Sequence, residues 1–482
     1  MLKIYLDWNI ISYLKKEEYI DLRNYIAEVK DFFVFPYSRA HLQDLYQSKS
    51  PTNVIKFEQD LETLTEICQT HLLEYNNSID APYPYECTPR QYMERESLTL
   101  QAYKSGFESI SFTELIKSLM DATTFESIRN YLYSTPLENS IENPSDGSYI
   151  QNLWDAILFI LDNLSSILKN EKLEVEIYKS MCKVEGERSI QEIQNINSYD
   201  IFDYLNKLCI SRTNKNLTDT ILATLEKTNG KNSYNYFLAE YTTLAFCGYS
   251  RDKKRNILNI MTDALHAYYA MRCDVLVTKD DGMRKKAQAE FIHYNSPTKI
   301  ITIEELRPFL EKEIYNQYNL DYIQHEVIPK YSKGEYRGEG KLAYKNVPSP
   351  IWGLFTNCIK LPEAPDALAL KVNLDPNGYV YYTELKRFFL LVMENFSDKQ
   401  KDIFQKEVID KFLTRNKNVI LSIKVFFYFK KRQIELIADP ESDVPLPMVI
   451  IRKKRKILFL IVNIISIFQN MYTSILSLLS KS

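Results

Sequence analysis

The first fifty residues alternate between short apolar runs and amphipathic stretches. Residues 2–6 are almost continuously apolar and predict a buried strand, which Asp7-Trp8-Asn9 ends before a short helix over residues 10–16. A second apolar run, Phe32 to Phe35, predicts another strand that ends at a proline, because proline cannot donate within a central strand. Residues 38–48 begin with serine, a good N-cap, and predict a second helix. This order of strands and helices predicts a parallel α/β sheet.

The next two hundred residues have mostly helical periodicity. Residues 57–75, 199–210 and 217–227 each carry an apolar face at helical spacing. The clearest apolar stripe consists of Leu153, Ile157, Leu161, Leu164 and Leu168. Loops are predicted at Pro82, Pro84 and Pro89 and over the polar stretch 138–148.

The α/β pattern returns at Thr262. The elements predicted from there are a helix over Asp263–Met271, a strand over Val275–Val277, a helix opening at Gly282, a strand over Lys299–Ile303 and a helix from Glu304. The sequence therefore predicts one α/β domain made of residues 1–50 and 251–315, which a mostly helical insertion, residues 51–250, splits in two.

The remaining chain has a mixed character. Residues 316–345 contain three glycines among charged residues and predict a linker, and residues 346–482 predict an accessory domain of α+β or α type. Residues 457–479 are long enough to cross a membrane, but polar residues recur along one side of that helix. We therefore expect an amphipathic helix that packs in a core or binds a partner. Because the basic residues 452–456 precede it, attachment to a membrane surface is the alternative.

Composition limits the compartment and the class of partner. The 482 residues carry a formal net charge of −3, which excludes a chain that is basic overall. Local basic runs are still compatible with nucleic acid, because phosphate contacts need only a local patch. The seven cysteines are scattered and never spaced as C-x-x-C, which disfavours both a disulfide framework and a thiolate zinc site. This pattern is typical of a cytoplasmic protein, and we find no signal peptide at the N-terminus.

Four carboxylates lie at the ends of the predicted α/β elements: Asp7, Asp44, Asp263 and Asp280. In an open parallel sheet, groups beyond the carboxyl ends of the strands meet in one crevice. Four acids gathered there repel one another unless cations lie between them, and such hard oxygen ligands favour Mg²⁺ or Mn²⁺ over zinc. Two such ions held roughly 3.5–4 Å apart activate a water and stabilise the leaving oxygen of a phosphodiester.

These residues resemble the PIN-domain nucleases. Ile4-Tyr5-Leu6-Asp7-Trp8-Asn9 resembles the opening strand of that family with its first acid, and Phe35-Pro36-Tyr37-Ser38 up to Asp44-Leu45 resembles the helix of the second acid. Asp263-Ala264-Leu265-His266-Ala267, continued by Asp274 to Asp280, resembles the third and fourth acids with the strand between them. The resemblance covers about a hundred residues. Two features depart from the family pattern: the second acid is usually Glu, and the insertion is unusually large.

The resemblance implies metal-dependent cleavage of RNA, less often of DNA, by Asp7, Asp44, Asp263 and Asp280. We expect an endoribonuclease with Mg²⁺ or Mn²⁺, and a protein partner or a second copy bound through the insertion or the C-terminal helix. A role as a toxin or phage-defence effector follows by analogy only.

Each acid also has a plainer interpretation. Asp7 is a possible turn residue, Asp44 a solvent-facing helix residue and Asp263 a first-turn acid favoured by the helix dipole. We assign the capping of the helix near Gly282 to Asp281 and the metal to Asp280. Candidate substrate-binding residues are Asn9, Ser38, Thr278, Arg284 and Lys285, although the first three also suit capping or turns. His41 and His266 are assigned structural roles.

A second motif lies in the C-terminal region. Asn373, Asp375, Asn377, Gly378 and Glu384 have the spacing of an EF-hand calcium loop. Asn at the first position and Pro376 within the loop favour a plain turn ahead of a helix instead.

Three other functions remain open. A PIN-like scaffold without catalysis would bind a protein or RNA partner through the same fold. A haloacid-dehalogenase phosphotransferase requires an acid two residues after its nucleophile, where Asn9 stands. A receiver domain requires an acid pair that the first strand lacks.

Overall fold

The computed structural model describes part of the chain. The chain forms two compact units. The first unit is Leu2–Phe309 with Asp375–Tyr381, and the second is Met1 with Leu310–Leu374 and Tyr382–Ser482. The predicted stripe at 153–168, the predicted helix at 457–479 and residues 373–378 of the possible calcium loop lie outside the described residues. The described ranges are 1–47, 52–96, 136–142, 149–152, 193–227, 231–250, 257–319, 322–327, 330, 343–360, 367–372, 379–394, 398–414, 416–429, 432–439 and 446–453.

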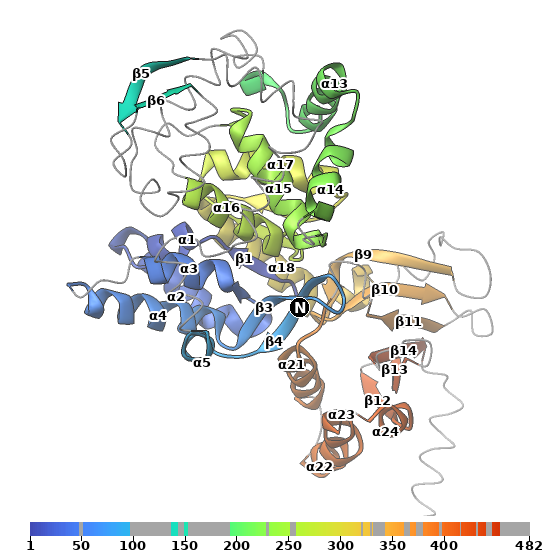
Figure 1. Cartoon of the computed structure of the whole chain (residues 1–482). Helices are drawn as coiled ribbons and strands as arrows, with labels where there is room; N and C mark the ends of the chain where they lie inside the picture. The colour runs from blue at the N-terminus through green and yellow to red at the C-terminus, as the bar shows by residue number, and fades with distance from the viewer. Residues whose placement is uncertain are drawn as a thin grey trace, which may run out of the picture. The chain divides into compact units, whose positions relative to one another are not determined.

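A small parallel sheet lies at the centre of the first unit. Its strands are β1 (Ile4–Leu6), β7 (Val275–Val277) and β8 (Lys299–Ile301), in the order β1-β7-β8. Ile4 pairs with Val275 and Val275 with Lys299, all in parallel. The apolar side chains of β1 and β7 are buried, which is typical of parallel strands covered on both faces. The predicted α/β class and these three strands are confirmed. Figure 1 labels β1 among the helices of this unit.

Helices connect and cover these strands. They are α1 (Trp8–Tyr13), α16 (Ile257–Ala270), α17 (Asp281–His293) and α18 (Ile303–Tyr318). The predicted start of α16 was wrong, because the helix begins six residues before Asp263. Asp263 therefore lies in the helix interior, and its plainer interpretation as a first-turn acid is excluded.

The second apolar run forms less strand than predicted. Lys30–Phe32 form a 3₁₀ turn, and within the run only Val34 pairs with β1, through a parallel bridge to Lys3. The two-residue strand β2 (Tyr37–Ser38) follows the proline instead of preceding it. The helix α3 (Arg39–Gln47) then begins as predicted, with the Ser38 hydroxyl accepting a hydrogen bond from the Ala40 amide.

The predicted insertion contains a hairpin that the periodicity did not indicate. β3 (His71–Asn76) pairs in parallel with β2 and antiparallel with β4 (Ala81–Glu86), so residues 71–75 are strand and not helix. Pro82 and Pro84, predicted as loop, lie in β4, an edge strand where the missing N–H groups cost no ladder bond. Part of the predicted loop 138–148 also belongs to a hairpin of β5 (Pro136–Glu142) and β6 (Tyr149–Asn152).

Of the other described helices of this unit, those over Val54–Cys68, Ile201–Thr213 and Leu217–Lys227 correspond to predicted helices, whereas those over Ile20–Val29 and Pro89–Arg95 were not predicted. The whole set is α2 (Ile20–Val29), α4 (Val54–Cys68), α5 (Pro89–Arg95), α13 (Ile201–Thr213), α14 (Leu217–Lys227) and α15 (Ser233–Phe246), with a 3₁₀ turn η1 at Glu17–Tyr19. Pro89 is the first residue of α5, where its missing N–H is harmless, and Thr88 and Gln91 complete a capping box.

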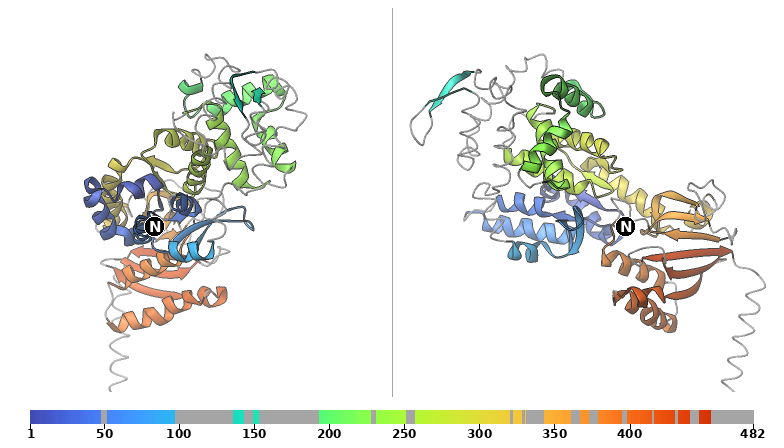
Figure 2. Two further views of the ribbon diagram at one scale, coloured as in Figure 1. Left: turned by 60° about the vertical axis from the view of Figure 1, so that its left-hand side comes forward. Right: turned by 45° about the vertical axis from the view of Figure 1, so that its right-hand side comes forward.

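The second unit contains a six-stranded antiparallel sheet in the order β12-β13-β14-β11-β10-β9. Its strands are coloured orange to red in Figure 2. The strands are β9 (Ala343–Ile351), β10 (Phe355–Lys360), β11 (Ala367–Lys371), β12 (Lys424–Phe429), β13 (Arg432–Ala438) and β14 (Pro447–Lys453). Its helices are α21 (Tyr382–Met393), α22 (Asp398–Phe404), α23 (Asp410–Leu413) and α24 (Lys417–Leu421), with π-helical turns at Ile323–Val327 and Gln405–Ile409. The α+β character expected for this region is seen in its described residues.

Glu384, the last position of the possible calcium loop, is buried in α21 and accepts a 2.5 Å hydrogen bond from the amino group of Met1. Its carboxylate therefore already has a cationic partner. Within the described ranges, no helix combines the length and the apolar composition that crossing a membrane requires.

Candidate functional site

The connections of the parallel sheet change direction at β1. Val34 pairs on one side of this strand, and the chain returns 240 residues later to add β7 on the other side. Asp7 directly follows β1, and its amide donates a 3.0 Å hydrogen bond to the carbonyl oxygen of Val277 in β7. A crevice forms at such a point because the two loops leave the sheet in opposite directions. The first predicted acid therefore lies where open α/β sheets bind their ligands.

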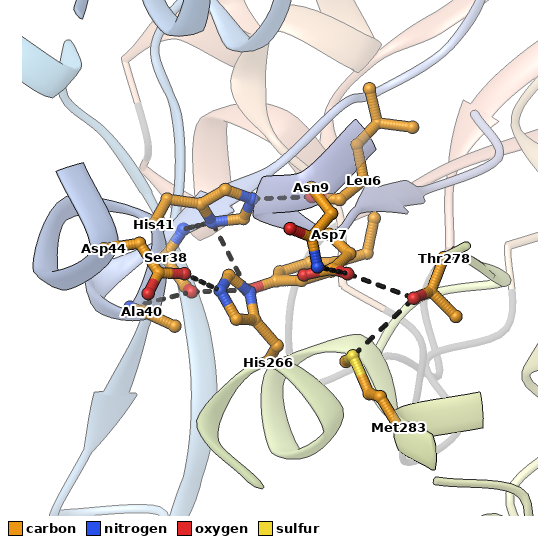
Figure 3. Close-up of polar contacts among 11 residues, drawn as sticks. Leu6, Asp7, Asn9, Ser38, Ala40, His41, Asp44, His266, Thr278 and Met283 are labelled. Atoms are coloured by element: carbon orange, nitrogen blue, oxygen red, sulfur yellow. Dashed lines mark hydrogen bonds and ion pairs between the residues drawn. The ribbon is translucent and has the colours of Figure 1, made fainter. Parts of the chain in front are cut away.

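The Asp7 carboxylate does not cap the helix that follows it. Asp7 occupies the N-cap position of α1, but its side chain makes no capping hydrogen bond. Instead, Oδ2 accepts hydrogen bonds from Thr278 Oγ1 at 3.0 Å and from Asn9 Nδ2 at 3.3 Å (Figure 3). Asp7 is only 2% exposed, both donors are neutral, and no lysine or arginine among the described residues pairs with it. A buried carboxylate in such surroundings is stabilised by a bound cation.

Asp280 caps the helix α17, a role that the sequence had suggested for Asp281. Its Oδ1 accepts a 2.7 Å hydrogen bond from the Met283 amide, so Asp280 and not Asp281 caps α17. Asp281 is exposed and pairs with Arg284 at 2.6 Å. The Asp280 amide donates to Thr278 Oγ1 at 3.1 Å, which links Asp280 to the Asp7 carboxylate through one hydroxyl.

Asp44 belongs to a buried hydrogen-bond network at the same end of the sheet. Its Oδ2 lies 2.9 Å from Nε2 of His266 in α16, and Nδ1 of that ring lies 2.9 Å from the Tyr5 hydroxyl in β1. The Tyr5 hydroxyl also lies 2.6 Å from Ser38 Oγ. Figure 3 shows this network together with Asp7. Three elements distant in sequence, namely β1, the β2–α3 segment and α16, are thereby joined.

The pKa values of the two histidines of the network are shifted in opposite directions. The Ser38 amide donates to Nδ1 of His41, so His41 Nε2 carries the proton that binds the Leu6 carbonyl oxygen at 2.7 Å. Burial, followed by the nearby His266, lowers the pKa of His41 well below its ordinary value. Burial alone would also lower the pKa of His266, but the hydrogen bond and charge of Asp44, with the charges of Asp7 and Asp263, raise it instead. Asp44 is therefore the strongest of the groups that favour the protonated form of His266.

Three of the four predicted acids, Asp7, Asp44 and Asp263, thus act on one imidazole. In the part of the chain that the structure describes, however, no three Asp, Glu, His or Cys side chains converge as a ready metal site. An all-protein cage of four acids is therefore not present in this conformation. Mg²⁺ is usually held by one or two carboxylates together with waters and substrate phosphate, and the Asp7 environment fits that mode of binding.

The candidate substrate-binding residues are placed as follows. Asn9 is exposed and contacts Asp7, whereas Ser38 and Thr278 are completely buried, the first capping α3 and the second holding Asp7. Arg284 is engaged by Asp281, and Lys285 is exposed.

Sequence reasoning did not find Tyr5 or the link between His266 and Asp44. The available signals were a tyrosine inside an apolar strand, whose hydroxyl requires a buried partner, and a histidine one helical turn after Asp263. Comparisons with protein-family models, with curated proteins and with solved structures gave no match.

Proposed function

We propose that this protein is a metal-dependent nuclease that hydrolyses phosphodiester bonds, with RNA as the expected substrate. The observation that carries the proposal is the Asp7 carboxylate. It lies at the carboxyl end of β1, where the connections change direction, is 2% exposed and does not cap α1. Within the described ranges, its hydrogen-bond donors are all neutral. A plain turn or capping aspartate would show the opposite pattern, with its side chain on the first amides of the helix.

In this proposal Asp7 is the primary ligand of a Mg²⁺ or Mn²⁺ ion, and Asp44, Asp263 and Asp280 contribute from the surrounding elements. The ion, when bound, would lower the pKa of the attacking water and stabilise the leaving oxygen. Thr278 and Asn9 hold one oxygen of Asp7 and so fix the direction of its carboxylate. The exposed Asn9 and Lys285 are the groups available to the phosphate backbone.

A PIN-like core is part of the same proposal. Val34, β1, β7 and β8 lie side by side in parallel, which supports this core. Asp7, Asp280 and Asp44 follow β1, β7 and β2, in the order that the resemblance implies. The insertion at 51–250 and the C-terminal unit would then supply regulation, and a role in toxicity or phage defence would follow from that combination.

The test uses the full chain with labelled single-stranded RNA, structured RNA and DNA in the presence of Mg²⁺ or Mn²⁺. Asp7→Asn keeps the shape of the side chain and removes its charge. Asp281→Asn is the matched control, because this aspartate is exposed and pairs only with Arg284 among the described contacts. We expect cleavage by the wild type and by the control, inhibition by a chelator, and a loss of at least about 100-fold for Asp7→Asn, as for other groups that act on the transition state.

One observation favours the second candidate, a PIN-like scaffold without catalysis. Asp44 is bound to His266 and Asp280 caps α17, so both carboxylates have structural partners. If no nucleic acid is cut and Mn²⁺ leaves the melting temperature unchanged, the nuclease proposal is wrong and the scaffold function replaces it.

A further inference from the structure

We propose that His266 is a positioning residue for the Asp44 carboxylate, an inference that rests on the proposed nuclease function. In this role His266 holds the Asp44 carboxylate in the orientation that faces the metal. His266 itself neither binds the metal nor transfers a proton to the substrate.

The contacts of the ring exclude those other roles. Nε2 is engaged by Asp44 at 2.9 Å and Nδ1 by the Tyr5 hydroxyl at 2.9 Å, so neither ring nitrogen is available as a ligand or as a base. The side chain of His266 is 1% exposed, whereas that of Asp44 is 21% exposed. The histidine is thus enclosed in the protein, and the carboxylate lies between it and the solvent-accessible side.

The ring is itself held rigidly. Tyr5 is completely buried, and its hydroxyl is shared by His266 and Ser38, while Ser38 is anchored by the Ala40 amide at the start of α3. His41 contacts the same hydroxyl at 3.3 Å and packs edge-on against the His266 ring with centroids 4.8 Å apart. These contacts of the ring come from β1 and from α3.

The consequence concerns the shorter second acid. A partly exposed aspartate on a helix ordinarily samples several rotamers, and ordering it on binding costs free energy. A hydrogen bond from a ring that is itself held by the Tyr5 hydroxyl and packed against His41 removes that freedom before the metal arrives. Partners of metal ligands act in this way, and their loss typically costs about 10–100-fold in metal affinity.

The experiment measures Mn²⁺ affinity by calorimetry on the full chain, with activity recorded separately. The variants are His266→Leu, Asp44→Asn and the double substitution, and His293→Gln is the matched control. His293 pairs with a carboxylate of the same unit, Glu240, at 3.3 Å, but outside the proposed site. We expect His266→Leu to weaken Mn²⁺ binding about 10–100-fold, and to cause no further loss when Asp44 is already Asn.

Tyr5→Phe is the milder variant should His266→Leu fail to fold. It removes the hydroxyl that holds Nδ1 and that also contacts Ser38 and His41. We expect a loss of about 2- to 10-fold in Mn²⁺ affinity, the effect of losing the hydrogen bond to His266. His266→Gln, which retains a donor, is expected to recover part of the loss.

The outcomes separate the two proposals. Additive losses in the double variant, or a loss no greater than that of His293→Gln, overturn the positioning role while leaving the nuclease intact. A wild-type protein that neither binds Mn²⁺ nor cuts any substrate overturns both.

Discussion

A buried pair of glutamates between α15 and α17 gives a prediction about stability that is independent of function. Glu290 in α17 is completely buried, and neither of its carboxylate oxygens has a hydrogen-bond partner among the residues that the structure describes. Glu240 in α15 is equally buried but accepts a 2.6 Å hydrogen bond from the Tyr294 hydroxyl and contacts His293 at 3.3 Å. Burial, and then the charge of Glu240, raise the pKa of Glu290 well above its ordinary value.

The expected effects of substitution have opposite signs within this pair. An unsatisfied buried polar group costs about 1–3 kcal/mol, so Glu290→Met, which is similar in volume, should increase the opening free energy of this region by about that amount. Glu240→Gln should lower it by about 1–3 kcal/mol, because the bonded partners Tyr294 and His293 lose a charged acceptor.

The pH dependence follows from the raised pKa of Glu290. A group whose folded pKa exceeds its unfolded value contributes its stability fully below the unfolded pKa, and that stability is lost as pH rises through the folded pKa. The wild type should therefore become less stable from mildly acidic to mildly alkaline pH. Glu290→Gln, which cannot ionise, should reduce this slope.

The assay is native-state hydrogen exchange on the full chain, followed in peptides from α15 and α17 and corrected for the intrinsic pH dependence of exchange. Local opening free energies avoid the assumption that a chain of two units unfolds in one step. If Glu290→Met lowers protection by 1 kcal/mol or more, or if wild-type protection is flat across this pH range, Glu290 has a compensating partner and the reasoning is refuted.

Three further predictions concern the same unit. Lys15 forms an ion pair with Asp60, which is 3% exposed. Lys15→Ala should lower the free energy of unfolding by roughly 2–3 kcal/mol, which is less than for a fully buried pair because the lysine is partly exposed. A guanidinium titration that shows no change in this free energy would contradict the prediction. Asp280→Ala should destabilise α17 by about 0.5–2 kcal/mol because the helix loses its N-cap. Asp281→Ala should change the stability of α17 by less than about 0.5 kcal/mol. Equal hydrogen-exchange rates in the two variants would show that Asp280 is not the cap. Asp7→Asn should raise stability without metal by about 1–3 kcal/mol and abolish any stabilisation by Mn²⁺; a lower metal-free stability would mean that the charge of Asp7 already has a partner.

Two strands of the central sheet, β1 and β7, could be predicted because they are short, apolar and completely buried. Ile4–Leu6 and Val275–Val277 are apolar segments that polar residues follow, so the ends of both strands could be placed. The helices next to them show an N-cap residue or an apolar face in the sequence. Local propensity and burial agree at these positions, so the periodicity of the sequence was sufficient.

The hairpin of β3 and β4 could not be predicted in the same way. Pro82 and Pro84 indicate a loop by local propensity, and they are tolerated only because β4 is the edge of its sheet. Val34 likewise pairs with a single residue, because the chain must turn at Pro36 to reach β3. Which strand forms an edge is decided by the pairing of distant segments.

The chain by itself determined the chemical types at the candidate site and their order after the strands. Asp7 and Asp280 follow apolar strands in the sequence, and parallel strands bring such positions to one end of a sheet. Only the tertiary structure decided what each carboxylate does there. Asp7 is left with neutral donors, Asp44 faces a histidine 222 residues away, and Asp280 caps a helix. The reason is that the function of a carboxylate depends on the donors and charges within a few ångströms of it, and most of these come from segments that only the folded chain brings together.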